Sequence, residues 1–206
     1  IGAMLVRKGD ADAMLCGTVG SYADHLRYVR TTIGLRPGAN TLAAMQLLIL
    51  PHRHLFICDT HVNPDPTAEQ VAEMTMLAAD AVRRFGIAPS VALLSHSNFG
   101  SSELPSAQKM RAALELIRAR HPDFEVDGEM QADTALSRAV MEGSMPDSPL
   151  TQEANLLIMP NVDAANITYN ALRVTAGAEH EVDLFLAGVL RGGDRERSQH
   201  LCDRLG

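Results

Sequence analysis

The stretch VALLSHSNFGSS, residues 91–102, joins a short apolar run to a loop of small and polar residues. Four consecutive apolar residues, VALL, are typical of a short buried strand. The next eight residues include four serines, an Asn and a Gly, and only Phe99 among them suits a core. The stretch therefore predicts a buried strand that ends in a polar loop, and it raises the question of what such a loop binds.

The rest of the chain alternates apolar runs with amphipathic segments. Thr67 and Gln70 form a capping-box pattern at the start of the clearest predicted helix, which ends at Gly86. Further helices are predicted after Ser21, from about Ser106 to His121, at 132–142 and, with Asp163 as N-cap, at 164–173; the apolar runs are 13–16, 42–50, 55–58, 91–94, 156–159 and 184–190. The alternation predicts an α/β protein with a largely parallel sheet and flanking helices, in one compact unit.

One pair of apolar runs differs from this alternation. Residues 42–50 and 55–58 flank the short sequence PHRH, and no helix fits between them. They predict a β-hairpin, although LAAM (42–45) taken alone also suits a helix.

Composition excludes several classes of partner. The 206 residues carry 18 basic and 25 acidic side chains, a net charge of −7, which disfavours a nucleic-acid or anionic-membrane surface. No apolar run approaches the ~20 residues of a transmembrane helix. The three cysteines lie far apart, as expected for free thiols in the cytoplasm. The chain begins at Ile1 without a Met, which indicates a fragment of a longer protein.

Polar loops follow four of the apolar runs. They are TVGSYADH (18–25), DTHVNPDP (59–66), SHSNFGSS (95–102) and PNVDAAN (160–166). Ligands of open α/β sheets bind beyond the carboxyl ends of the strands, where free backbone N–H groups and helix N-termini favour anions. The serine hydroxyls and Gly100 therefore predict a pocket for an anionic or phosphate-bearing ligand. An ordinary strand–helix connection with capping residues is the alternative.

Common catalytic and metal-binding patterns are absent from the sequence. It has no GxSxG, P-loop, HExxH or GxGxxG motif. His52, His54 and His61 are close in sequence but are better explained as solvated loop residues than as zinc ligands. The acids of DGEMQAD (127–133), namely Asp127, Glu129 and Asp133, suit either a Mg²⁺ site or, preferably, the start of a helix. We therefore predict no metal site in this chain.

Several blocks of the sequence resemble the phosphate acetyl/butyryltransferase family. They are LVRKGDADAMLCGTVGSYADHLR (5–27), DTHVNPDPTAEQVAEM (59–74), ALLSHSNFGSS (92–102), DGEMQADTAL (127–136) and ANLLIMPNVDAANITYNALR (154–173). SHSNFGSS and VRRFGIAP (82–89) resemble one branch in particular, the phosphotransacetylase-like C-terminal domain of multidomain bacterial NADP-dependent malic enzymes. Active acetyltransferases generally carry a Ser-Thr-Lys-Gly type of loop where this chain has SNFG.

The resemblance implies a fold, a ligand and a role. The fold is the two-lobed α/β architecture of phosphate acetyltransferases and isocitrate dehydrogenases, with residues 1–206 as one such domain that lacks its first part. The ligand is acetyl-CoA or acetyl phosphate in the cleft between lobes, and the assembly is a homodimer or a higher homo-oligomer. The role is to sense acetyl-CoA and regulate a malic enzyme module, absent from this chain, that would hold NADP and a divalent metal.

The same resemblance assigns candidate site residues. It places Ser97, Asn98, Gly100 and Ser101 at the phosphate and acyl end of the cleft. It places Asn161, Asp163 and Asn166 in a second cleft loop and Arg27 as an anion-binding residue, with Tyr28 where active enzymes often have Pro. These eight residues are the predicted acetyl-CoA or phosphate site.

The C-terminal segment departs from the family. Active members carry a catalytic Asp and a Ser-Arg pair near their end, whereas Asp194, Arg195 and Ser198 have the right types in the wrong arrangement. This departure predicts a domain without catalysis of its own. A working phosphate acetyltransferase and a scaffold with an empty cleft are the alternatives. For the dimer contact we expect the helix 164–173 or the helix that starts near Ser106.

Overall fold

A computed structural model describes residues 1–11, 14, 19–35, 38–178 and 180–185. Its centre is a six-stranded sheet with the order β4-β3-β5-β2-β1-β6. The strands are β1 (Ala44–Leu50), β2 (Arg53–Cys58), β3 (Ser90–Leu94), β4 (Glu125–Met130), β5 (Leu156–Ile158) and β6 (His180–Phe185). Strands β4, β3, β5 and β2 run parallel, whereas β1 is antiparallel to both of its neighbours. The predicted α/β class with a largely parallel sheet is confirmed.

The β-hairpin is confirmed as well. Strands β1 and β2 pair in antiparallel register from Met45 opposite Cys58 to Leu50 opposite Arg53. The sequence LAAM is therefore not helical, and Ala44 and Met45 begin β1. Local preference for a helix gives way here because Met45, Leu47 and Phe56 bury their side chains in the core under the sheet.

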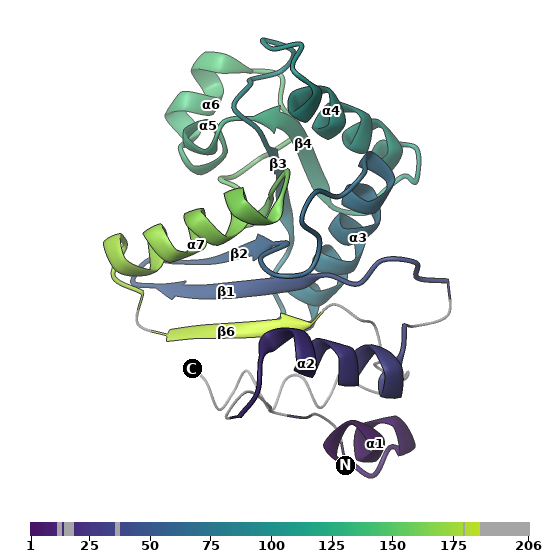
Figure 1. The fold of residues 1–206 in the computed structure, drawn as a ribbon. Coiled ribbons are helices and arrows are strands. Elements are labelled where there is room, and N and C mark those ends of the chain that lie inside the picture. Colours follow the sequence, from purple (N-terminus) through teal and green to yellow (C-terminus); the bar gives the residue numbers. More distant parts are fainter. Residues whose placement is uncertain (12–13, 15–18, 36–37, 179, 186–206) are drawn as a thin grey trace.

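Helices cover both faces of the sheet (Figure 1). One face packs against α3 (Ala68–Arg84) and α4 (Pro105–Arg118), with Val91, Leu93 and Met110 in their shared core. The other face packs against α5 (Ala132–Leu136), α6 (Arg138–Ser144) and α7 (Val162–Thr175). Because both faces are covered, β5 and all of β3 after Ser90 carry apolar side chains, which explains the continuous apolar runs in the sequence.

The predicted helix starts hold in two cases. Thr67 and Gln70 form a complete capping box for α3, and the hydroxyl of Ser21 accepts the amide of Asp24 at the start of α2 (Tyr22–Tyr28). The start of α7 was predicted wrongly, because Asn161 and not Asp163 is its N-cap. The Asn161 side chain accepts the amide of Ala164, and Asp163 lies in the first turn.

The acidic segment 127–133 is mostly strand, so the predicted helix start is wrong for two of its three acids. Asp127 and Glu129 belong to the buried strand β4, and only Asp133 lies in the first turn of a helix. The predicted single helix at 132–142 is two short helices, α5 and α6. Ser137 separates them because its backbone is extended (φ −135°, ψ 113°).

A small helical group lies at the N-terminal side of the chain, below the β6 edge in Figure 1. It consists of α1 (Gly2–Lys8), α2 and the π-helix η1 (Val29–Ile33). Its apolar cluster includes Val29 and Leu42, with Val62 from the loop after β2 packed against them. Most of the apolar run 13–16 and the end of 184–190 lie outside the described residues. No helix in the described ranges has the length and apolarity needed to cross a bilayer.

Gly128 offers a test of the β3–β4 packing. Its φ is +149°, and a Cβ at this position would lie 2.7 Å from the backbone oxygen of Leu93. We expect Gly128→Ala to lower the free energy of unfolding by roughly 2–4 kcal/mol, from overpacking and backbone strain together. Urea denaturation followed by circular dichroism measures this change.

Gly143→Ala is the matched control. Gly143 lies in α6, and a Cβ there meets nothing within 4 Å. The control should shift the unfolding free energy by at most about 1 kcal/mol, toward greater stability. Equal effects of the two substitutions would contradict the close β3–β4 approach.

Candidate functional site

Three of the polar loops gather at one edge of the sheet. Strands β2, β3 and β5 are parallel, so the loops that follow them leave from the same side. The Val162 amide donates to the Pro64 carbonyl over 3.2 Å, which joins the loops after β5 and β2. Lys109 of α4 adds a second link, since its Nζ donates to the Pro160 carbonyl over 2.7 Å and pairs with Asp65. Three of the four predicted strand-end loops therefore follow parallel strands at one edge, and most of the run before the fourth, 18–25, lies outside the described residues.

The serine loop, residues 95–102, is built around Glu129 of β4. Glu129 Oε1 accepts the Ser97 hydroxyl over 2.6 Å and the Gly100 amide over 2.9 Å. The Glu129 carbonyl accepts the Phe99 amide over 2.7 Å. Both Ser97 and Glu129 are fully buried. The loop therefore closes over a carboxylate of the protein itself.

Serine hydroxyls within the loop accept hydrogen bonds from most of its remaining backbone amides. Ser97 Oγ accepts the Ser102 amide over 3.1 Å, and Ser101 Oγ accepts the Asn98 amide over 3.0 Å. Ser95 Oγ accepts the Ser97 amide over 3.3 Å. Together with the bonds to Glu129, these contacts satisfy the amides of residues 97, 98, 99, 100 and 102. The loop thus lacks the row of free N–H groups that a phosphate cradle uses.

Backbone conformation explains the Phe-Gly pair in the loop. Phe99 has φ +46° and Gly100 has φ +90°, so two successive residues are left-handed. A Cβ on Gly100 would meet nothing within 4 Å, so the turn requires glycine for its conformation and not for space. This turn aims the Gly100 amide at Glu129.

Arg111 of α4 completes the charge balance of the site. Its guanidinium donates to Glu129 Oε1 over 2.9 Å and to the Ser102 carbonyl over 2.9 Å. Burial raises the pKa of Glu129, but hydrogen bonds from Ser97, from the Gly100 amide and from Arg111 outweigh it and hold the pKa below its ordinary value of 4.5. Glu129 is therefore ionised at neutral pH.

The outer rim of the loop consists of side-chain amides and His96. Asn98 Nδ2 donates to Gln131 Oε1 over 3.1 Å, and the Gln131 backbone amide donates to Asn98 Oδ1 over 2.7 Å. His96 Nε2 lies 3.0 Å from Ser102 Oγ. Ser101 and Gly100 are exposed, and Asn98 is half-buried. A ligand at this edge would meet these three residues first, because Ser97 lies beneath them.

The second predicted loop is ordered by its own side chains. The Asn161 side chain caps α7 over 2.8 Å, and the Asn166 carboxamide oxygen accepts Asn170 Nδ2 over 3.1 Å. Asp163 is exposed on the first turn of α7. The link between Val162 and Pro64 holds this loop beside the loop after β2. No hydrogen bond between described residues joins it to the serine loop.

Arg27 stands apart from the serine loop. It lies on α2, pairs with Asp24 over 3.3 Å, and its side chain is 63% exposed. Its guanidinium carbon is 5.3 Å from the Tyr28 ring centroid. The same helix contacts the loop after β2 through Tyr22, whose ring lies 4.6 Å from the His61 ring. Its role as an anion-binding residue stays a prediction.

Asp59 organises the loop after β2. Its carboxylate accepts the amides of Ala44, His61, Val62 and Asn63, over 2.9–3.1 Å. Cys58, directly before it, is fully buried, and burial with the nearby Asp59 charge raises the pKa of the thiol well above 9.0. Cys58 therefore stays protonated and does not act as a nucleophile at neutral pH.

The histidines and acids that were candidates for metal ligands lie apart. His52 and His54 are exposed on the β1–β2 hairpin, and His61 is half-buried beside Tyr22. Asp127 binds Arg118 over 2.8 Å and Ser148 over 2.6 Å. Within the described ranges, no three His, Cys, Asp or Glu residues cluster in a way that would hold a metal ion.

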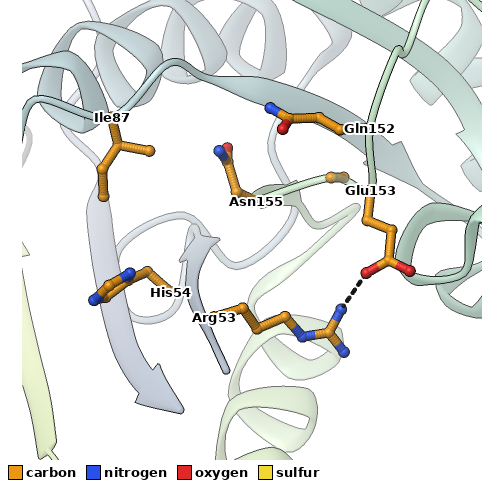
Figure 2. A pocket seen from close by; sticks show the side chains of 7 residues that line it. Arg53, His54, Ile87, Gln152, Glu153 and Asn155 are labelled. Carbon is orange, nitrogen blue, oxygen red and sulfur yellow. Dashed lines mark hydrogen bonds and ion pairs between the residues drawn. The ribbon is translucent and has the colours of Figure 1, made fainter. Parts of the chain in front are cut away.

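A hollow of about 400 Å³ lies at the opposite edge of the sheet, where β2 and β5 begin (Figure 2). Arg53, His54, Ile87 and residues 152–155 line it. Arg53 pairs with Glu153 over 3.1 Å. The Asn155 side chain accepts the Ser90 amide and donates to the Ala88 carbonyl. Arg53, Glu153 and Asn155 are thus already bound to other residues of the protein, and none of the predicted site residues lines the hollow.

Sequence reasoning missed the residues that organise the site. Glu129 was predicted only as one of three acids at a helix start or a Mg²⁺ site, and no role was predicted for Arg111 or Lys109. The available signal was a pair of basic residues on either side of the buried Met110, in the helix that follows the serine loop. The carboxylates Asp65 and Glu129, which they bind, lie 44 and 18 positions away in sequence, so no local pattern identifies them.

The lowered pKa of Glu129 predicts a pH-dependent contribution to stability. Its folded pKa lies below the unfolded value, so its stabilisation is present above about pH 4.5 and is lost as pH falls through the folded pKa. At pH 7 we expect Glu129→Gln to lower the free energy of unfolding by roughly 1.5–3 kcal/mol, the range for hydrogen bonds to charged groups. The difference in unfolding free energy between this variant and the unaltered chain should shrink in acid.

Urea denaturation over a series of pH values measures that difference in unfolding free energy. Glu153→Gln serves as the control, because Glu153 forms an ion pair with Arg53 while its side chain is 45% exposed. The control should change stability by less than about 1 kcal/mol at every pH. A Glu129→Gln penalty that stays constant down to the acid limit of folding would contradict a charged Glu129.

Comparisons with known proteins agree with this architecture. The chain is 53% identical over 191 residues to the NADP-dependent malic enzyme of Escherichia coli K12, which covers 93% of this chain and 25% of that protein. It is 32% identical over 196 residues to the phosphate acetyltransferase of the same strain, covering 95% of this chain and 27% of that protein. The chain thus spans about a quarter of the length of these relatives.

Solved structures show the same fold. A phosphotransacetylase from Streptococcus pyogenes is 29% identical and superposes with a TM-score of 0.84 over 97% of this chain and 63% of that one. The family model described as "Phosphate acetyl/butaryl transferase" matches residues 1–187. Because this match includes the sheet, its flanking helices and all three described edge loops, the chain belongs to the phosphate acetyl/butaryl transferase family.

Proposed function

We propose that this chain is the phosphate acetyltransferase-like domain of a cytoplasmic NADP-dependent malic enzyme, and that it binds acetyl-CoA without catalysing acetyl transfer. In this proposal the parent protein oxidatively decarboxylates malate to pyruvate. NADP and the divalent metal bind the malic enzyme module, and the domain regulates that module and contributes to dimerisation.

Sequence identity is the observation that carries the proposal. Identity to the Escherichia coli malic enzyme is 53%, against 32% to the phosphate acetyltransferase of the same strain, over nearly the same residues. The chain aligns with both relatives over nearly its whole length, so the difference in identity separates two branches of one family and not two folds.

The serine loop supports the part of the proposal that denies catalysis. Most of its amides are taken within the loop or by Glu129, and its buried hydroxyl belongs to Ser97. Acyl transfer needs a base within reach of the thiol and donors aimed at the developing oxyanion. Around this loop the described residues offer a salt-bridged Glu129 and an exposed His96–Ser102 pair. The segment with Asp194, Arg195 and Ser198 lies outside the described residues.

Helix α7 supports the proposed association. Ile167 is 68% exposed and Val174 is 76% exposed, seven positions apart and so on the same side of the helix. The other candidate helix, α4, buries Met110, Leu114 and Ile117 in the core of this chain. An exposed apolar side on α7 suits a two-fold contact between copies, the commonest form of soluble oligomer.

Acetyl-CoA should raise the melting temperature of the chain. Binding to the folded state alone adds about 2.7 kcal/mol at a ligand concentration of about 100 Kd. At about 2–4 °C per kcal/mol, the rise is about 5–10 °C. Arg27→Ala should diminish the rise, whereas Arg30→Ala, exposed on the adjoining η1, should not. A coupled assay of acetyl-CoA formation from acetyl phosphate and CoA should show no turnover.

The two measurements separate the proposal from its alternatives. No rise in melting temperature at millimolar acetyl-CoA would indicate a scaffold with an empty cleft. Turnover in the coupled assay, abolished by Arg27→Ala, would establish a working phosphate acetyltransferase.

The association is tested by mass. The chain has a mass of 22.2 kDa, and size-exclusion chromatography with light scattering at micromolar concentration should give about twice that value. Ile167→Asp should shift the mass toward a monomer, because a charge on the α7 face is costly to bury. Leu104→Asp, at a side chain 59% exposed before α4, is the control and should leave the mass unchanged. A monomer for the unaltered chain would refute the dimer.

A further inference from the structure

The two oxygens of the Glu129 carboxylate have different surroundings. Oε1 accepts three donors: Ser97 Oγ at 2.6 Å, the Gly100 amide at 2.9 Å and Arg111 at 2.9 Å. Oε2 is buried and has no hydrogen-bond partner among the described residues. An ionised carboxylate in this position is tolerated because the Arg111 charge lies beside it. The carboxylate is thus tied to the serine loop through a single oxygen.

The loop's internal bonds depend on that oxygen. Ser97, once its hydroxyl donates to Glu129, presents its oxygen to the Ser102 amide at 3.1 Å. Ser97 Oγ also lies 3.0 Å from Ser101 Oγ, which accepts the Asn98 amide. The exposed residues of the loop, Gly100 and Ser101, are therefore connected to the buried Glu129 by a continuous chain of hydrogen bonds.

We propose that Glu129 is the positioning residue of the serine loop: it fixes the conformation in which Asn98, Gly100 and Ser101 face a ligand, and so sets the affinity for the acyl ligand. Glu129 is fully buried and acts through the loop, not by contact with the ligand. The affinity part of this proposal depends on acetyl-CoA binding at this edge, as proposed above. The conformational part does not.

Asp127 provides an internal comparison on the same strand. It too is a buried carboxylate that binds an arginine, Arg118 at 2.8 Å, and a serine, Ser148 at 2.6 Å. None of its hydrogen-bond partners belongs to residues 95–102. Removing its charge therefore disturbs a similar buried pair in β4 without touching the serine loop.

Amide hydrogen exchange of the 206-residue chain tests the conformational part. We expect Glu129→Gln to speed exchange at Gly100 and Ser102 about tenfold, the size that follows from losing one hydrogen bond to a charged group. Asp127→Asn should leave both amides as they are in the unaltered chain. Equal exchange of the loop in the two variants would overturn the proposal.

Calorimetric titration with acetyl-CoA tests the affinity part. Glu129→Gln should weaken binding about tenfold and Asp127→Asn should not, although both remove one buried charge. Ser97→Ala should weaken binding similarly, and Ser97→Ala with Glu129→Gln should be no weaker than the worse single variant, since both act on one link. Additive losses, or unchanged affinity of Glu129→Gln, would refute the assigned role.

The outcomes separate this proposal from the proposed function. Failure of the unaltered chain to bind acetyl-CoA would refute the function, while exchange that rises only in the loop would still support Glu129 as the residue that fixes it. If Glu129→Gln does not fold, Ser97→Ala removes a donor and keeps the ion pair with Arg111. Faster exchange at Gly100, whose amide binds Glu129 and not Ser97, supports the proposal in that variant, and unchanged exchange at Gly100 overturns it.

Discussion

A buried carboxylate costs free energy unless charge and hydrogen bonds compensate it, and the carboxyl edge of this sheet is arranged around one such group. Glu129 is fully buried, yet Arg111, Ser97 and the Gly100 amide surround one of its oxygens. This compensation decides where the loop after β3 goes and how α4 lies beside it. It also explains why a serine-rich loop at a sheet edge presents so few free backbone donors.

Local sequence patterns predicted the elements whose determinants are local. The α3 capping box, the hairpin of 42–50 with 55–58 and the strand at 91–94 each follow from residues within a few positions, and each is present. The class of the sheet followed from the alternation of these elements. The edge loops came together because parallel strands end on the same side, which is a consequence of topology.

The errors arose where distant residues decide the outcome. EVDGEM does not look like a buried strand, because Asp127 and Glu129 occupy buried positions that depend on distant partners, among them Arg118 and Arg111. The serines of SHSNFGSS predicted donors for a ligand, but a hydroxyl that finds a local amide or carboxylate turns inward instead. At the start of α7 the predicted cap was Asp163, but Asn161 has the extended backbone of a cap and its side chain accepts the Ala164 amide.

Helix α4 contacts all three edge loops, since Lys109 reaches Asp65 and the Pro160 carbonyl while Arg111 reaches Glu129 and Ser102. Each of these basic residues has an acidic partner on a different segment of the chain. A substitution of either lysine or arginine alone leaves a carboxylate without its counter-charge, so the two members of each pair should change together during evolution. An alignment of relatives would then show Lys109 covarying with Asp65, and Arg111 with Glu129, as two separate couplings carried by one helix.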